Sequence, residues 1–239
     1  MMVTNIKGII FDYGGTIDTD SRHWAKVLWS QYQKHKVPVD EDSFREAYIF
    51  GERSLAEYPY VSSKDNFHQV LAYKTKLQVE YLALQNKLPM DETLLQQYAK
   101  QVTDSSYRYV LDVLKITRPV VEELSHRYKL VLVSNFYGNI HTILNDFGLD
   151  TFFSSVVESS VVGVRKPDPA IYRMGVNAMG FNAEEVAVIG DSFSKDMVPA
   201  KRIGCKIIWL KGERWEKEEV DESLPDAIIT SLPQLLDFV

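Results

Sequence analysis

Six short runs of mostly apolar residues are spread along the chain. They are residues 6–11, 129–133, 155–157, 186–189, 206–210 and 227–229, of which 155–157 is the weakest and 227–229 is a short last one. The apolar residues in these runs are consecutive rather than alternating with polar ones. That pattern is typical of strands that are buried on both faces of a parallel sheet.

Segments of helical length separate the later runs. In one of them Asp168 is a suitable N-cap and Pro169 suits the first helical position. The apolar pattern then continues through Met179, and Gly180 suits the helix end. Strands that alternate with helices at this spacing predict a doubly wound, Rossmann-like α/β core with a parallel sheet.

The stretch from Thr19 to Leu114 has a different character. Its apolar residues recur at helical spacing, for example at Trp24, Leu28 and Tyr32, and strand-like runs are almost absent. A crossover between parallel strands needs only about a dozen residues. We therefore predict that residues 19–114 form an inserted α-helical cap domain and that residues 1–18 and 115–239 form the α/β core.

Composition narrows the range of partners and locations. The 239 residues are 45% hydrophobic and 25% charged, with a net charge of −6, which disfavours nonspecific binding to nucleic acid or to anionic membranes. No apolar run approaches the roughly 20 residues that span a membrane. The first apolar run is interrupted by Lys7, unlike a secretory signal, and the single cysteine, Cys205, excludes an intramolecular disulfide. We expect a cytoplasmic protein; its oligomeric state is open.

Polar and charged side chains follow several of the predicted strands. The first strand leads into Asp12-Tyr13-Gly14-Gly15-Thr16, the second into Ser134-Asn135, and the fourth into Gly190-Asp191, with Asp196 soon after; Arg165-Lys166-Pro167 precedes the proline-initiated helix. In open α/β sheets, ligands bind outside the carboxyl ends of the strands. We therefore expect these residues to share one site.

These residue types suit phosphoryl transfer. A carboxylate at Asp12 can attack phosphorus and form an aspartyl-phosphate, which divides one difficult step into two. Asp12 and Asp191 together would offer the hard oxygen ligands that Mg²⁺ prefers. Lys166 would place a positive charge against the phosphoryl oxygens, while Thr16 and Ser134 could donate hydrogen bonds to them.

The same residues resemble the four motifs of the haloacid dehalogenase superfamily. Asp12 to Thr16 resembles the first motif, Asp-x-Asp-Gly-Thr; Ser134-Asn135 resembles the second, Lys166 the third, and Gly190-Asp191 through Asp196 the fourth. The resemblance extends over essentially the whole chain, because a helical insert after the first motif is similar to the type 1 cap of this superfamily.

The resemblance implies a role for each matching residue. Asp12 would be the nucleophile and a metal ligand, together with the backbone carbonyl of Gly14 and the carboxylate of Asp191. The phosphoryl group would be bound by Thr16, Ser134, the amide of Asn135 and the side chain of Lys166. Asp196 would support the metal site or orient Lys166. The expected substrate is a small phosphorylated metabolite, whose identity the sequence leaves open.

The chain departs from the family pattern at Gly14, where family phosphatases have a second aspartate that protonates the leaving oxygen and later activates water. Such acid–base catalysis contributes about 10²–10⁴-fold to the rate, or about 3–5 kcal/mol. Glycine keeps the carbonyl that would bind the metal. Metal binding should therefore persist while ordinary phosphomonoester hydrolysis is weakened or takes its proton from elsewhere.

Gly14 leaves alternatives to an ordinary phosphatase. The chain also resembles phosphonoacetaldehyde hydrolase, a relative with alanine at this position and a cap lysine that forms a Schiff base, for which Lys26, Lys34, Lys36 and Lys64 are candidates. Haloacid dehalogenases proper lack the second aspartate and use no metal, but the Gly-Gly-Thr sequence and the Asp191 to Asp196 motif are more similar to the phosphate-transferring branch. A catalytically weak phosphate-binding or protein-interaction module is the third reading.

Overall fold

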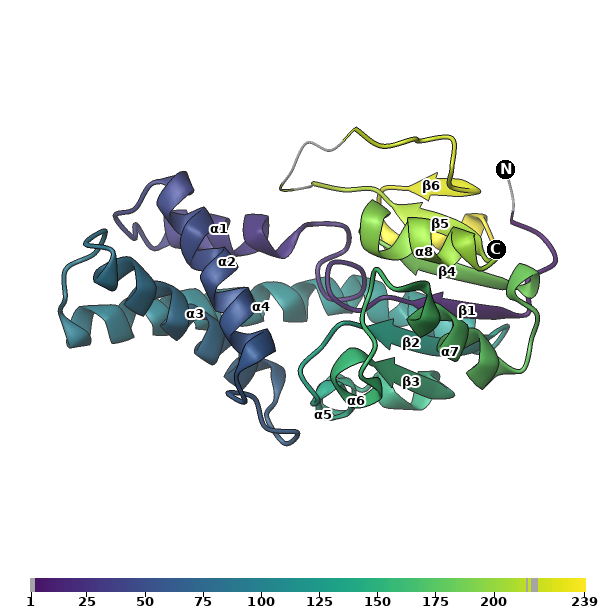
Figure 1. Ribbon diagram of the computed structural model, residues 1–239, viewed down its shortest axis with the longest axis horizontal. Coiled ribbons are helices and arrows are strands. Elements are labelled where there is room, and N and C mark those ends of the chain that lie inside the picture. The colour runs from purple at the N-terminus through teal and green to yellow at the C-terminus, as the bar shows by residue number, and fades with distance from the viewer. Residues whose placement is uncertain (1–2, 214, 216–218) are drawn as a thin grey trace.

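A computed structural model describes residues 3–213, 215 and 219–239. Its centre is a parallel sheet of six strands in the order β3-β2-β1-β4-β5-β6 (Figure 1). The strands are β1 (Gly8–Phe11), β2 (Lys129–Ser134), β3 (Ser155–Glu158), β4 (Val186–Gly190), β5 (Lys206–Leu210) and β6 (Ala227–Ile229). All six expected strands and the doubly wound α/β class are confirmed; the first strand begins two residues later than its apolar run.

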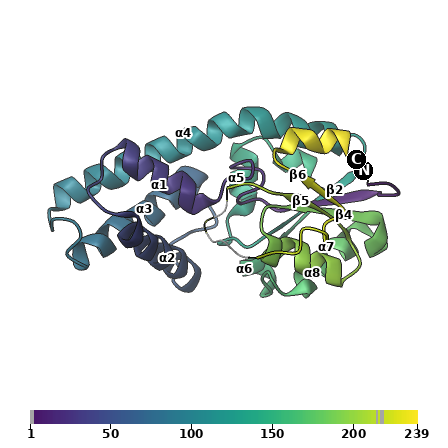
Figure 2. The same cartoon turned by 90° about the horizontal axis from the view of Figure 1, so that it is seen from above.

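Helices cover both faces of this sheet (Figure 2). One face packs against α4 (Glu92–Ser125), α5 (Ile140–Asp146) and the 3₁₀ turn Leu232–Asp237 near the C-terminus. The other face packs against α7 (Pro169–Met179) and α8 (Val198–Arg202). Side chains of successive β1 residues alternate between the two cores, with Ile9 in the first and Ile10 in the second. Burial on both faces explains why the strand sequences are continuously apolar.

Helix α7 begins and ends where the sequence predicts. Asp168 caps it by accepting a hydrogen bond from the backbone N–H of Ala170 at 2.9 Å, Pro169 is its first residue, and Gly180 ends it in the left-handed conformation. Gly175 in its middle brings the helix close to the sheet: a Cβ atom there would lie 2.9 Å from Ile10 Cδ1 and from Val133 Cγ2.

Gly175→Val should therefore destabilise the protein by about 1–3 kcal/mol, because overpacking of a close-packed core forces the helix or the strands to move. Asn177→Val, at an exposed position of the same helix, is the matched control and should change stability by no more than about 0.5 kcal/mol. Urea denaturation of both variants measures the difference. Equal stabilities would show that α7 can move away from the sheet at little cost.

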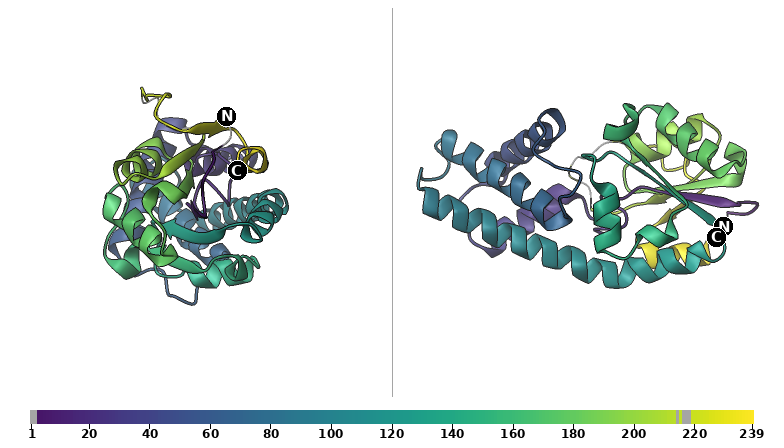
Figure 3. Two further views of the ribbon diagram at one scale, coloured as in Figure 1. Left: turned by 90° about the vertical axis from the view of Figure 1, so that its right-hand side faces the viewer. Right: turned by 90° about the horizontal axis from the view of Figure 1, so that it is seen from below.

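The helices that precede β2 form a separate lobe beyond one end of the sheet (Figures 1 and 3). This helical lobe comprises α1 (Trp24–Lys34), α2 (Glu41–Glu57), α3 (Phe67–Leu84) and the first half of α4. It has a hydrophobic core of its own, which includes Leu28, Tyr32, Phe44, Leu82 and Val102. The apolar positions at helical spacing in the sequence are the residues that fill this core.

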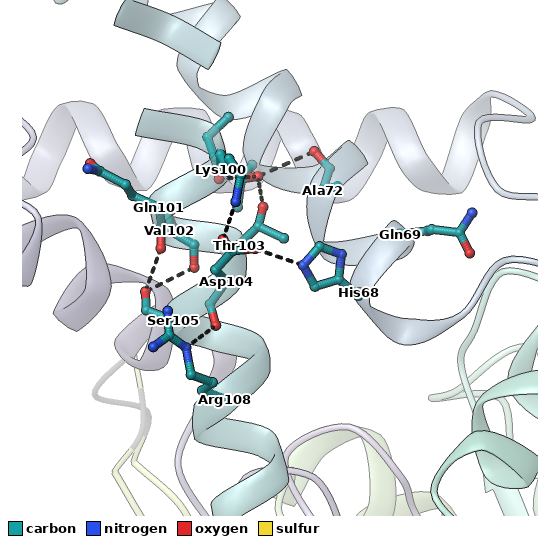
Figure 4. Close-up of polar contacts among 12 residues, drawn as sticks. His68, Gln69, Ala72, Lys100, Gln101, Val102, Thr103, Asp104, Ser105 and Arg108 are labelled. Carbon is teal, nitrogen blue, oxygen red and sulfur yellow. Dashed lines mark hydrogen bonds and ion pairs between the residues drawn. The ribbon is translucent and has the colours of Figure 1, made fainter. Parts of the chain in front are cut away.

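Polar contacts join α3 to α4 inside the helical lobe (Figure 4). The carboxylate of Asp104 lies 2.9 Å from His68 Nε2 and 2.6 Å from Lys100 Nζ, and these two partners lower its pKa, Lys100 more than His68. Nearby, the hydroxyl oxygens of Thr75 and Thr103 are 2.7 Å apart and buried. The two longest helices of the lobe are therefore held together by polar as well as apolar contacts.

Helix α4 is continuous from Glu92 to Ser125 and passes from the helical lobe onto the face of the sheet (Figure 2). The expected domain boundary between residues 114 and 115 falls inside this helix. The division into core and cap stays a prediction, with one helix shared by both parts. Among the described residues, the helices are too short or too polar for any of them to cross a membrane.

Candidate active site

The carboxyl ends of three neighbouring strands carry the polar residues that the sequence singled out. Strand β1 pairs with β2 on one side and with β4 on the other, so Asp12, Ser134 and Asp191 come to the same edge of the sheet. A cavity of about 1100 Å³ opens at this edge, and residues of both the sheet and the helical lobe line it. Of the predicted site residues, Asp12, Gly14, Ser134, Asn135, Lys166, Asp191 and Asp196 line this cavity, and Thr16 does not.

The amine of Lys166 joins two carboxylates in the floor of the cavity. Its Nζ contacts Asp12 Oδ1 and donates to Asp196 Oδ1 at 2.7 Å, and all three side chains are at least 94% buried. Burial lowers the pKa of Lys166, but the charges of Asp12 and Asp196 together raise it above its ordinary value. Lys166 is therefore a fixed positive charge beside Asp12.

Asp196 has a hydrogen-bond donor at each of its carboxylate oxygens. Oδ1 accepts from the Tyr172 hydroxyl at 2.6 Å as well as from Lys166, and Oδ2 accepts from the backbone N–H of Ser192 at 2.9 Å. These contacts suit a residue that orients Lys166, one of the two roles implied by the resemblance. The sequence analysis missed Tyr172, because its position on the apolar face of α7 indicates only a core residue.

Asp12 and Asp191 have the properties of cation ligands. Carboxylate oxygens of Asp12, Asp191 and Asp196 lie within 4.8 Å of one another. Within the described part of the chain, the Asp191 carboxylate accepts no hydrogen bond, and burial followed by the charge of Asp12 raises its pKa well above the ordinary value. Burial also raises the pKa of Asp12 to about 6, although Lys166 opposes this. A hard cation would relieve both effects, so this oxygen donor set fits Mg²⁺.

Gly15 makes room for the Asp191 carboxylate. Its φ angle of +96° is in the region that favours glycine, and a Cβ atom on it would lie 2.5 Å from the Asp191 carboxylate carbon. The loop after β1 can therefore approach the acidic pair only if residue 15 has no side chain. This explains one of the two glycines in the first motif.

The residues expected to bind the phosphoryl group occupy different positions around Asp12. Ser134 is buried at the end of β2, and Thr16, which is fully buried, donates its hydroxyl to Asp12 Oδ2 at 3.2 Å. The side chain of Asn135 bonds to the backbone of Lys166 twice, accepting from its N–H at 2.8 Å and donating to its carbonyl at 3.0 Å. The Asn135 side chain thus fixes the loop that carries Lys166, which leaves its backbone amide as the group for the predicted phosphoryl contact.

The helical lobe adds a polar cluster to the opposite wall of the cavity, which the sequence analysis missed. Lys74 is 7% exposed and forms an ion pair with Glu52 at 2.6 Å, while the Tyr137 hydroxyl donates to the other oxygen of Glu52 at 3.2 Å. Burial lowers the pKa of Lys74, but Glu52 and Tyr137 raise it above the ordinary value. Glu52 and Lys74 look like ordinary helix surface in the sequence, and Tyr137 looks like an ordinary residue of the loop after β2.

The lysines named as Schiff-base candidates lie elsewhere. Of the described lysines, Lys74, Lys166 and Lys195 line the cavity, and Lys26, Lys34, Lys36 and Lys64 do not. Because Lys74 is paired with a carboxylate and its pKa is raised, it is a protonated ammonium group and not the neutral amine that attacks a carbonyl.

Comparisons with known proteins show the family to which the chain belongs. The family of haloacid dehalogenase-like hydrolases matches residues 6–204. A glyceraldehyde 3-phosphate phosphatase of Pyrococcus abyssi is 26% identical over 212 residues, which cover 86% of this chain and 82% of that protein. A phosphoserine phosphatase of Thermus thermophilus is 36% identical over 88 residues, or 37% of this chain and 34% of that protein. The chain spans about two fifths of the length of the glyceraldehyde 3-phosphate phosphatases of Pyrococcus furiosus and Methanocaldococcus jannaschii.

Solved structures share the fold. The HAD hydrolase YfnB of Bacillus subtilis, in a magnesium-bound form, is 20% identical with a TM-score of 0.60, and the alignment covers 97% of both chains. A dehalogenase is 16% identical with a TM-score of 0.63, covering all of this chain and 99% of that one. The family match covers most of the chain, and the strand order and the residues at the strand ends are consistent with it. The chain therefore belongs to the haloacid dehalogenase-like hydrolases.

Proposed function

We propose that this protein is a Mg²⁺-dependent phosphatase that hydrolyses a small phosphorylated metabolite through an aspartyl-phosphate on Asp12. The observation that carries the proposal is the meeting of Asp12, Asp191 and Lys166 at one end of a cavity. Relatives that are named phosphatases support the reaction class, and their names include two small phosphorylated substrates.

The residues at this edge of the sheet have different roles in phosphoryl transfer. Asp12 attacks phosphorus with a carboxylate oxygen, and the fixed charge of Lys166 stabilises the negative charge on the phosphoryl oxygens. Ser134 and the backbone amide of Asn135 hold the remaining oxygens, while Thr16 holds the second oxygen of Asp12. In the second half of the reaction, water attacks the same phosphorus and frees Asp12 as a carboxylate.

The residues that would hold Mg²⁺ are Asp12, Asp191 and the backbone carbonyl of Gly14. When bound, the ion neutralises charge on the phosphate and on the two carboxylates. The charge of Asp12, which contributes to the raised pKa of Asp191, is then offset by the cation. Metal binding should for this reason be strongest at a pH where both carboxylates are ionised.

The lobe wall of the cavity would contact the part of the substrate that leaves. Trp24, Tyr48 and Phe67 provide aromatic surface there, and the Lys74–Glu52 pair provides polar groups. Such a mixed wall suits a small organic group with several polar atoms. The protonated state of Lys74 does not favour Schiff-base chemistry, so this site is not suited to phosphonate cleavage through Lys74.

A panel of substrates tests this function. The purified protein should release inorganic phosphate from glyceraldehyde 3-phosphate, phosphoserine, acetyl phosphate or other small phosphate esters with Mg²⁺, and EDTA should remove the activity. Calorimetric titration should show Mg²⁺ binding that Asp191→Asn weakens. Binding of Mg²⁺ and beryllium fluoride without any phosphate release would indicate a binding module. Chloride release from 2-chloropropionate in the presence of EDTA would instead indicate a dehalogenase.

A further inference from the structure

A second carboxyl group of the loop after β1 faces the cavity. Asp18 is 1% exposed and is one of the residues that line the cavity. Its Oδ1 accepts a hydrogen bond from the backbone N–H of Gly15 at 2.7 Å, and its Oδ2 accepts one from Trp24 Nε1 at 2.9 Å. These two contacts hold the carboxyl group in one orientation, although it makes no ion pair with any described residue.

Trp24 lies close both to the Asp18 carboxyl group and to Gly14, the position where family phosphatases have the acid–base aspartate. Among the described residues, the single atom that a Cβ on Gly14 would meet within 4 Å is Trp24 Nε1, at 4.0 Å. The indole N–H that holds Asp18 is therefore the described group nearest to a Cβ atom at residue 14. The carboxyl group of Asp18 and a side chain at residue 14 thus have the same indole nitrogen as a neighbour.

We infer that Asp18 is the acid–base catalyst of the phosphatase reaction, in place of the aspartate that is absent at Gly14. The inference rests on the proposed function and adds the source of the leaving-group proton. In the first step Asp12 forms a bond to phosphorus, the bond from phosphorus to the ester oxygen breaks, and Asp18 gives its proton to that oxygen to yield an alcohol. In the second step the Asp18 carboxylate takes a proton from water, whose oxygen displaces Asp12 to release inorganic phosphate.

The surroundings of Asp18 favour a group that can both give and accept a proton. Burial raises its pKa to about 7, against the hydrogen bonds from Gly15 and Trp24, which lower it. The charge of Asp12 raises this pKa further and that of Lys74 lowers it. The other titratable groups that interact with Asp18 are Asp191 and three tyrosines, Tyr13, Tyr48 and Tyr109. An acid–base catalyst works best when its pKa is near the working pH.

The test compares two substrates whose leaving groups differ in their need for a proton. Asp18→Asn should lower kcat/KM for an alkyl phosphate such as glycerol 3-phosphate by about 10²-fold or more. For acetyl phosphate, whose acetate leaves unprotonated, kcat/KM should fall less than about tenfold. With acetyl phosphate, kcat should fall and the acid-trapped phosphoenzyme should accumulate, because water attack also loses its base. A role in structure alone would lower kcat/KM for both substrates equally.

Two further variants complete the test. Asp20→Asn is the matched control. Asp20 is a carboxylate of the same loop, but it accepts a hydrogen bond from the backbone N–H of Leu232 and does not line the cavity. This variant should keep the kcat/KM of the parent protein for both substrates. Adding Gly14→Asp to Asp18→Asn should restore alkyl phosphate hydrolysis by at least about tenfold. If Asp18→Asn lowered kcat/KM equally for the two substrates, or did not lower it, the acid–base role of Asp18 would be wrong while the proposed function would stand. Absence of Mg²⁺-dependent phosphate release by the parent protein would overturn the proposed function itself.

Discussion

Asp12→Asn should abolish phosphate release from every substrate, with a loss on the order of 10⁴-fold or more, as expected when a nucleophile is removed. The amide has the same shape as the carboxylate, but its oxygen is a poor nucleophile and no longer offers a negative charge to Mg²⁺ or to Lys166. The loss should include acetyl phosphate, because a good leaving group cannot replace the attacking atom. Steady-state phosphate release with both substrates measures it.

The folded state should survive this substitution, because Lys166 retains its ion pair with Asp196 at 2.7 Å. Circular dichroism can therefore show whether Asp12→Asn is inactive because it lacks the nucleophile or because it is unfolded. Asp112→Asn is a suitable control, since Asp112 is an exposed carboxylate that pairs with Lys115 on the outside of α4. If Asp12→Asn kept the activity of the parent protein, Asp12 could not be the nucleophile.

Lys166→Met should both unfold the protein more easily and reduce its activity. Methionine fills much of the same volume but leaves the buried carboxylates of Asp12 and Asp196 without their counter-charge. Breaking a buried ion pair from one side costs about 3–5 kcal/mol in unfolding free energy. Loss of the positive charge beside the phosphoryl group should lower kcat by about 10²–10³-fold. Urea denaturation and phosphate release measure the two effects.

Magnesium gives this variant a distinctive property. With one positive charge removed from the acidic cluster, Mg²⁺ should bind Lys166→Met more tightly than the parent protein and recover part of the lost stability. Lys201→Met removes an ion pair with Asp226 whose side chains are 37% and 25% exposed, and it should cost no more than about 1 kcal/mol. A similar cost for both variants would mean that water reaches Lys166 and screens its charge.

The strands were the most predictable part of this fold, because the central strands β1 and β4 are buried along their whole length and contain no polar side chain. The ends of α7 were equally predictable. An N-cap aspartate followed by proline and a C-cap glycine depend only on contacts within one turn of the helix. The extent of α4 was not, because a helix that leaves one core and joins another changes its buried face along its length. Val102 packs into the core of the helical lobe and Val121 into the core against the sheet, although both belong to this one helix.

The floor of the cavity was predictable for a different reason. Asp12, Ser134, Lys166 and Asp191 stand next to strands or to a helix start, and the sheet order then brings them together. Asp18, Lys74 and Tyr172 could not be found in this way. Their importance depends on what lies across the cavity or across a helix interface, and a single sequence contains no local signal for such contacts.

The continuity of α4 limits how the helical lobe can move relative to Asp12. The lobe is tied to the sheet by two connections, the segment after Thr19 and this helix of 34 residues, which is about 50 Å long. A loop can change direction by rotation about a few backbone bonds, whereas a long helix without a kink bends gradually over many turns. The hydroxyl of Thr117 also anchors the helix to the Ile17 carbonyl at 2.7 Å. Any movement of the lobe away from Asp12 would therefore have to bend this one long helix.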